Sequence, residues 1–290
     1  MALDPQSLLR RSFEPIQHRF TVRDTMLYAL GVGLGSDPLD RGQLRYVYED
    51  GLTAMPTFAN VLAYPGFWAR ESDTGIDWKR LVHAEQTIEL HAPLPVEGLV
   101  TGHNRVSGLW DKGAAKGALM QQVRELESAA GLPLATVTQL TLLRGDGGCG
   151  SAGEGEPPAP HPLPERSADA VCDLPTLPQS ALIYRLSGDY NPLHADPAVA
   201  GAAGFSRPIL HGMCTMGIAA HAVLRSILAY DAARFAGMRV RFTAAVLPGD
   251  TLRTELWVDG DVVSLRTTAL ERGVVVLDKG RVDLRPVNHH

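Results

Sequence analysis

The stretch P-I-L-H-G-M-C-T-M-G-I-A-A-H-A-V-L, residues 208–224, predicts a long buried helix. Apolar and small residues fill almost every position, which is typical of a helix that is enclosed by the rest of the protein. An earlier apolar stretch with a proline, M-P-T-F-A-N-V-L-A-Y at residues 55–64, is its expected counterpart. The chain therefore holds two candidate central helices.

Similar segments surround the two stretches in the same order. A tyrosine-led segment precedes each: Y-A-L-G-V-G from Tyr28 and Y-R-L-S-G-D from Tyr184. After each come a matching turn, A-P-L-P-V-E-G-L-V or A-A-V-L-P-G-D-T-L, and alternating β-strand patterns such as L-R-T-E-L-W-V. This order predicts a tandem duplication of an α+β unit, a helix wrapped by an antiparallel sheet. Chance similarity between two α+β segments is the alternative.

A Gly- and Pro-rich run separates the two units. R-G-D-G-G-C-G-S-A-G-E-G-E-P-P-A-P-H-P-L-P, residues 144–164, cannot sustain a helix or a central strand. We expect a first repeat over residues 1–145, a linker over 146–180 and a second repeat over 181–290.

Bulk properties exclude several classes of protein. The 290 residues are 45% hydrophobic, enough for a sizeable core, and the net charge of -5 argues against a nucleic-acid partner. Cys149, Cys172 and Cys214 are expected to be free thiols. Without a signal peptide or a long apolar window, the sequence predicts a cytoplasmic protein with no membrane partner. The excess of arginine over lysine suggests a bacterial source, and the end V-N-H-H is not the peroxisomal S-K-L.

The segment Y-R-L-S-G-D-Y-N-P-L-H places Asp189 and His194 in a run of turn-forming residues. One interpretation is a surface turn, because Ser-Gly-Asp and Asn-Pro are strong turn signals. The first-half counterpart, Y-A-L-G-V-G-L-G-S-D-P-L-D, keeps the Tyr, the Leu and the Pro-Leu but has Asp40 where His194 stands. A turn that served only the fold would be expected to keep similar chemistry in both copies. The asymmetry therefore predicts that Asp189 and His194 form a catalytic proton-transfer pair.

Two longer motifs carry a family resemblance. L-S-G-D-Y-N-P-L-H-A-D, followed by G-F-S-R-P-I-L-H-G-M-C-T, closely resembles the signature of the MaoC-like hydratases, the (R)-specific enoyl-CoA hydratase 2 family. The resemblance extends to Y-A-L-G-V-G, V-H-A-E-Q and D-K-G at Asp111, in the two-repeat form related to peroxisomal multifunctional enzymes. It implies a double hotdog fold with the active site in the C-terminal half. It also implies reversible hydration of (2E)-enoyl-CoA to (3R)-3-hydroxyacyl-CoA, with an acyl-CoA substrate and no separate cofactor.

Such a hydration needs a base for the water, an acid for C2 and donors for the charge on the thioester oxygen. We assign base and acid jointly to Asp189 and His194, because coupled groups resist single-site assignment. Asn191 is expected to orient the loop or the water. Gly212 leaves room for a carbonyl, and its N–H lies at the positive end of the helix dipole. The resemblance implies that this N–H is the oxyanion donor.

For the CoA portion, the resemblance implies contacts from a set of residues on four segments: His83, Ala84, Lys112, Tyr190, Asn191, Pro192, Leu193 and Phe242. Ala84 departs from the glycine that relatives often have. Lys112 is either a cation for the phosphate or adenine side or a solvated loop lysine. Phe242 lines the tunnel or fills the core. His211 is better interpreted as a structural histidine than as a second base.

Of the other possible functions, one is excluded by the sequence and two stay open. G-V-G-L-G-S from Gly31 lacks the glycine spacing and βαβ context of a dinucleotide site. A hotdog thioesterase and a non-catalytic acyl-CoA-binding protein are the remaining alternatives, since one fold hosts several functions. The Cys and His residues lack metal-ligand spacing, so no metal is expected. A homodimer is possible through edge-to-edge sheets, and the degenerate first half is expected to open space for the acyl tail.

Overall fold

The computed structural model describes residues 2–153, 155–156 and 159–286, so the question whether His289 and His290 are native falls outside it. Its strands are β1 (Ile16–Phe20), β2 (Leu81–Leu90), β3 (Gly98–Asp111), β4 (Ala118–Ser128), β5 (Pro133–Leu143), β6 (Ala152–Gly153), β7 (Ala170–Pro175), β8 (Phe235–Phe242), β9 (Thr251–Asp259), β10 (Val262–Ala269) and β11 (Val274–Leu284). The α-helices are α1 (Pro5–Leu9), α2 (Val22–Gly31), α3 (Arg41–Leu44), α4 (Ser180–Tyr184), α5 (Pro197–Ala202) and α6 (Gly212–Ser226). Short 3₁₀ helices are η1 (Pro56–Asn60), η2 (Trp68–Arg70), η3 (Trp78–Arg80), η4 (Arg185–Ser187), η5 (Pro192–His194), η6 (Ala232–Arg234) and η7 (Leu270–Arg272).

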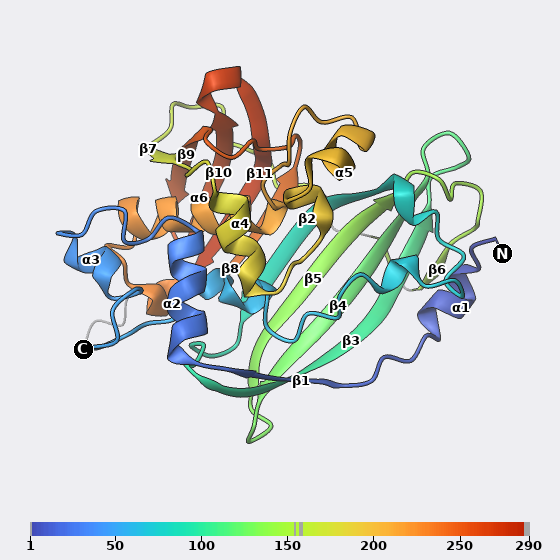
Figure 1. Cartoon of the computed structure of the whole chain (residues 1–290), viewed down its shortest axis with the longest axis horizontal. Coiled ribbons are helices and arrows are strands. Elements are labelled where there is room, and N and C mark those ends of the chain that lie inside the picture. The colour runs from blue at the N-terminus through green and yellow to red at the C-terminus, as the bar shows by residue number, and fades with distance from the viewer. Residues whose placement is uncertain (1, 154, 157–158, 287–290) are drawn as a thin grey trace.

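The strand order reveals the duplication. The sheet runs β1-β3-β4-β5-β2-β8-β11-β10-β9-β7, and every neighbouring pair is antiparallel. The order reads the same from both ends if β1–β5 correspond to β7–β11 in a fixed way: β1 to β7, β2 to β8, β3 to β9, β4 to β10 and β5 to β11. The two repeats therefore share one continuous sheet, joined where β2 meets β8 (Figure 1). The predicted α+β architecture is confirmed.

The second repeat contains the predicted central helix. Helix α6 begins at Gly212 rather than at Pro208, because His211 has an extended backbone and acts as the N-cap. All residues from Met213 to Leu224 are buried, and the helix packs against β7, β8 and β9. Gly217 is required there, since a Cβ atom would lie 2.5 Å from Val32 Cγ1. The core around α6 also includes Tyr28 and Tyr184, the equivalent tyrosines of the two repeats, whose rings lie 5.7 Å apart.

The first repeat lacks the helix predicted over Met55–Tyr64. Only the short 3₁₀ helix η1 forms there, and Ala63 adopts a left-handed backbone with φ 48°. A continuing α-helix would use the carbonyls of Ala59 and Asn60 to accept from Ala63 and Tyr64. Both carbonyls instead accept from Arg124 Nη2, and the Ala63 N–H donates to His18 Nδ1. The described chain thus places no helix as long as α6 over β3, β4 and β5 (Figure 1).

The segment between the repeats follows the surface. β6 pairs with β3, and β7 pairs with β9, so both ends of this segment join a sheet. The division into repeats and a 146–180 linker stays a prediction. All three cysteines are free, as expected.

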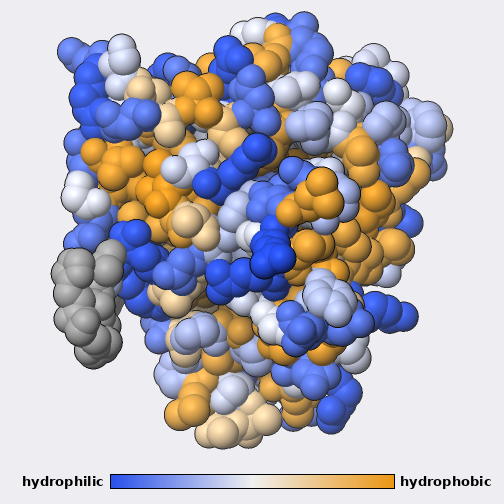
Figure 2. Space-filling model, turned by 90° about the vertical axis from the view of Figure 1, so that its left-hand side faces the viewer, coloured by the Kyte–Doolittle hydropathy of each residue, from blue (hydrophilic) through white to orange (hydrophobic). Residues whose placement is uncertain are grey.

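No described helix is long and apolar enough to cross a membrane. On the side of the molecule shown in Figure 2, apolar patches are interrupted by hydrophilic residues.

A buried carboxylate fixes the junction of the repeats. Glu85 on β2 accepts from Arg239 and Arg241 on β8, with each guanidinium donating through Nε at 2.9 Å and also through Nη2. The Glu85 side chain is 5% exposed. Because one oxygen serves each arginine, the carboxylate can satisfy both cations only when β2 and β8 keep this register.

Replacing this carboxylate is expected to weaken the junction. Glu85→Gln should lower the free energy of unfolding by about 2 kcal/mol, because two charge-assisted interactions are lost while the half-exposed Arg241 can still reach water. Urea denaturation measures the change. Glu89→Gln, at an exposed position on the same face of β2, is the matched control and should stay within about 0.5 kcal/mol. Equal losses in both variants would contradict a special role for Glu85.

Candidate active site

A short irregular segment between α4 and α5 carries Asp189 and His194. Gly188 ends η4 with φ 124°, a backbone that favours glycine, and so turns the chain toward Asp189. Asn191 then caps η5, its side chain accepting from the Leu193 N–H at 3.0 Å, with Pro192 at the first helical position. This bond agrees with a role for Asn191 in orienting the loop, and a role in orienting the water stays a prediction. His194 ends the turn with its side chain buried.

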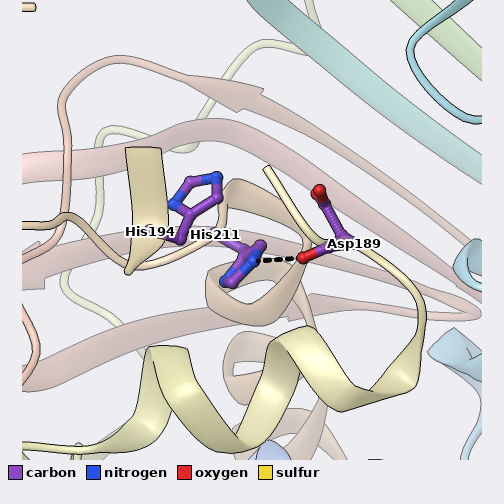
Figure 3. A group of neighbouring side chains, drawn as sticks. All are labelled: Asp189, His194 and His211. Carbon is purple, nitrogen blue, oxygen red and sulfur yellow. Dashed lines mark hydrogen bonds between the residues drawn. The ribbon is translucent and has the colours of Figure 1, made fainter. Parts of the chain in front are cut away.

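Asp189, His194 and His211 converge although they come from different elements (Figure 3). One ligand-type atom from each lies within 4.8 Å of the others. His194 Nδ1 lies 2.8 Å from the Ile209 carbonyl oxygen, which only accepts, so Nδ1 donates and Nε2 is left as the acceptor. Burial lowers the pKa of His194, which keeps its ring neutral at neutral pH. A neutral imidazole with a free Nε2 is suited to accept a proton.

His211 contacts both Asp189 and His194. Its Nε2 donates to the backbone carbonyl of Asp189 at 3.1 Å, and its ring stacks on His194 at 3.7 Å between centroids. Burial, with His194 beside it, lowers the pKa of His211 to about 3. Its bond to the Asp189 backbone agrees with the structural role favoured from the sequence.

Gly212 lies next to two other predicted contact residues. A Cβ atom on Gly212 would lie 3.1 Å from the Phe242 ring, so glycine lets the start of α6 approach that ring. Phe242 in turn contacts the His83 ring, with centroids 4.6 Å apart. His83 Nε2 donates to Gln86 Oε1 at 2.9 Å, and burial lowers the pKa of His83 to about 4. Ala84 is the bulge residue that shifts the register of β2 against β5 between His83 and Glu85.

Three of the remaining predicted contact residues are exposed at the surface. Tyr190 is 58% exposed beneath the Arg185 guanidinium, and Pro192 is also exposed. Lys112 is exposed in the turn after β3. That turn lies at the same end of the sheet as His83, but β4 and β5 separate their strands, a span of roughly 15 Å. The structure therefore does not bring Lys112 into contact with the others.

Two residues near this group were missed by the sequence interpretation. Tyr64 is half-buried, and burial together with the Asp189 carboxylate raises its pKa to about 12. Arg124 is 5% exposed, with its guanidinium carbon 5.7 Å from the Tyr64 ring. A sequence signal for Arg124 exists: it stands two residues from both Gln122 and Leu126, a spacing that places all three on one face of a β-strand.

The cluster also bears on metal binding. The expectation of no metal was based on sequence spacing, whereas the fold gathers Asp189, His194 and His211, a donor set that suits a cation. In both histidines one ring nitrogen already donates to a backbone carbonyl, so each has only one nitrogen left as a ligand.

Comparisons with known proteins match both repeats. Residues 18–145 match the MFE-2 hydratase 2 N-terminal domain, and residues 161–279 match the MaoC like domain. Enoyl-CoA hydratase ChsH3 of Mycobacterium tuberculosis is 37% identical over 297 residues, covering 99% of this chain and 100% of the relative.

Solved structures agree. A MaoC-like dehydratase from Phytophthora capsici superimposes with a TM-score of 0.88 and 31% identity, over 98% of this chain and 99% of that one. A Mycobacterium tuberculosis protein described as having a double hotdog fold matches with a TM-score of 0.59, 18% identity and 98% coverage of both chains, a likeness of fold alone. The predicted double hotdog fold is thereby confirmed. With both repeats matched and a full-length relative above 30% identity, the chain belongs to the MaoC-like dehydratase and enoyl-CoA hydratase 2 family.

Proposed function

We propose that this protein catalyses the reversible hydration of (2E)-enoyl-CoA to (3R)-3-hydroxyacyl-CoA, as a hydro-lyase of fatty-acyl or related thioesters. The observation that carries the proposal is the convergence of the Asp189 carboxylate and the neutral His194 ring beside the start of α6. The mycobacterial relative is an enoyl-CoA hydratase, which supports the same reaction class.

The reaction uses each part of this arrangement. A water held between the Asp189 carboxylate and His194 Nε2 loses a proton to one of them as its oxygen attacks C3. The negative charge moves through the conjugated system to the thioester oxygen, which the Gly212 N–H stabilises at the positive end of α6. C2 then takes a proton from the same pair. Because both transfers come from one side of the double bond, the addition is syn, and dehydration follows the same steps in reverse.

Only the second repeat is assigned a catalytic role. In the first repeat Asp40 occupies the position that corresponds to His194, and its carboxylate already accepts from the Gly42 N–H at 2.9 Å and from the Tyr230 hydroxyl at 3.1 Å. The first bond caps α3, and the second joins Asp40 to Tyr230 in the second half of the same chain. Asp40 therefore has a structural role. One active site per chain follows.

The CoA portion is assigned to the end of the sheet where His83 and Lys112 lie. His83, Ala84 and Phe242 border the site, and the loop Tyr190–Leu193 projects Tyr190 and Pro192 outward, where a pantetheine arm would pass. Lys112 would reach only the distal phosphates or adenine. Cytoplasmic location and a homodimer stay predictions from the sequence.

Removing either catalytic group should abolish most turnover without unfolding the protein. Asp189→Asn and His194→Ala are each expected to lower kcat for (2E)-butenoyl-CoA by about 100- to 10,000-fold, the usual contribution of general acid–base groups. Loss of the conjugated thioester absorbance measures the rate. Asp37→Ala, at an exposed position in the first-repeat copy of the segment, is the control and should stay within a few fold. A matching loss of thermal stability in the two catalytic variants would support a structural turn instead.

Product analysis tests the reaction class. Coupling to dehydrogenases of known stereospecificity should detect the (3R) product and not the (3S) product. EDTA should leave the rate unchanged, because the mechanism needs only proton transfers by protein groups. Activity that depends on added metal would assign the Asp189–His194–His211 cluster to a cation. Release of free CoA thiol would indicate a thioesterase.

The pH dependence should reflect the buried histidine. Because burial lowers the pKa of His194, its neutral form persists below the ordinary value of about 6.5. Activity requires that form, so kcat/KM should be constant from pH 8 to pH 6.5 and fall only at lower pH. An acid limb with its midpoint above 6.5 would contradict a neutral His194 in the free enzyme.

A further inference from the structure

A row of glutamines lines the inner face of the first-repeat sheet. Gln86 on β2 pairs in register with Gln139 on β5, which pairs with Gln122 on β4. These three residues border a cavity of about 10 Å³, room for about one water-sized group, together with a second set of residues: Asn60, Tyr64, Arg124, Val137 and Met213. The cavity lies where the second repeat has α6 and the first repeat has only the short η1. Its lining is mostly polar, which is unusual for a site that takes a hydrocarbon chain.

Arg124 is the charged member of this lining. Its Nη2 donates to the carbonyls of Asn60 at 2.7 Å and Ala59 at 3.3 Å, but its buried Nε has no partner. No ion pair within the described ranges includes Arg124. On the adjacent strand Asn104, which faces Arg124 in register, has an unpartnered and buried Nδ2. A buried cation without a counter-charge is costly, and an acceptor oxygen placed against it would be strongly bound.

The cavity adjoins the active site. Met213 lines it and directly follows Gly212, the proposed oxyanion donor. Tyr64 lines it as well, with Arg124 on one side, and lies near enough to Asp189 for that carboxylate to affect its pKa. An acyl chain whose thioester carbonyl is held at Gly212 therefore has this cavity beside it.

We propose that the acyl chain runs past this cavity and that preferred substrates carry an acceptor oxygen on that chain, which enters the cavity and is bound by Arg124 and the glutamine row. A carboxylate satisfies the site best, since it supplies the missing counter-charge. A plain alkyl tail offers no acceptor, so the buried Nε of Arg124 would stay without a partner and the guanidinium without a counter-charge. The inference depends on the proposed hydration, because it concerns the substrate class of that same site.

The wild-type protein tests this directly. Three series of (2E)-enoyl-CoA from C6 to C12 are compared at equal chain length: methyl-terminated, ω-carboxylate and ω-carboxylate methyl ester. At the best length, kcat/KM for the carboxylate should exceed that for the alkyl chain by about tenfold or more, as expected for charge-assisted hydrogen bonds. If the ester is preferred as strongly as the carboxylate, the site recognises an acceptor oxygen rather than a negative charge. A preference for alkyl chains at every length overturns the inference.

Variants assign the effect to the cavity. Arg124→Met should reduce the carboxylate-to-alkyl ratio to near one, whereas Arg105→Met, exposed on β3 and paired with Glu125, should leave both the ratio and the rate unchanged. Arg124→Met also removes two bonds to η1, so Gln139→Leu, whose Nε2 donates only to Thr141 Oγ1, is a second variant and should lower the ratio without that loss. A ratio unchanged in both variants overturns the assignment. If the wild-type protein hydrates none of these (2E)-enoyl-CoA substrates, the proposed function fails; if it hydrates them but prefers alkyl tails, only this inference fails.

Discussion

The ion triad of Glu85 with Arg239 and Arg241 is the interaction on which the rest of the structure depends. It sets the register between β2 and β8, and those two strands also carry the walls of the active site. His83 lies two residues before Glu85, and Phe242 follows Arg241 directly. The same register that pairs the charges therefore brings the His83 ring against Phe242, and Phe242 against Gly212. The strand register that joins the two repeats therefore also assembles the site.

Much of this arrangement could be predicted from the sequence. The helix over residues 208–224 is apolar at nearly every position, so local pattern and tertiary burial agree, and the structure differs only at the capped start. The duplication was predicted from the repeated order of similar segments rather than from any single element. Asp189 and His194 were found because turn chemistry and asymmetry between the copies are both visible in a linear chain.

What the sequence did not reveal depends on contacts between distant residues. Met55–Tyr64 has a helical composition, but Arg124, far along the chain, takes the carbonyls that a helix needs, and this competition is invisible locally. The grouping of His211 with Asp189 and His194 arises from stacking across a loop. Lys112 lies two strands away from His83, so its contact with the phosphate or adenine side of CoA stays a prediction.

The contact between Tyr28 and Tyr184 has a consequence for how the two copies can change. Equivalent residues that touch must lie beside the pseudo-twofold axis, so each is the other's packing partner as well as its counterpart. A change in side-chain volume at either tyrosine therefore alters the packing of the other repeat. The features that differ between the repeats lie beside this contact: the Tyr28 hydroxyl donates to the Thr57 carbonyl in η1, and the Tyr184 ring lies 5.0 Å from the His211 ring. Divergence after duplication is thus coupled between the repeats, because η1 of the first repeat and the active site of the second each pack against one tyrosine of this pair.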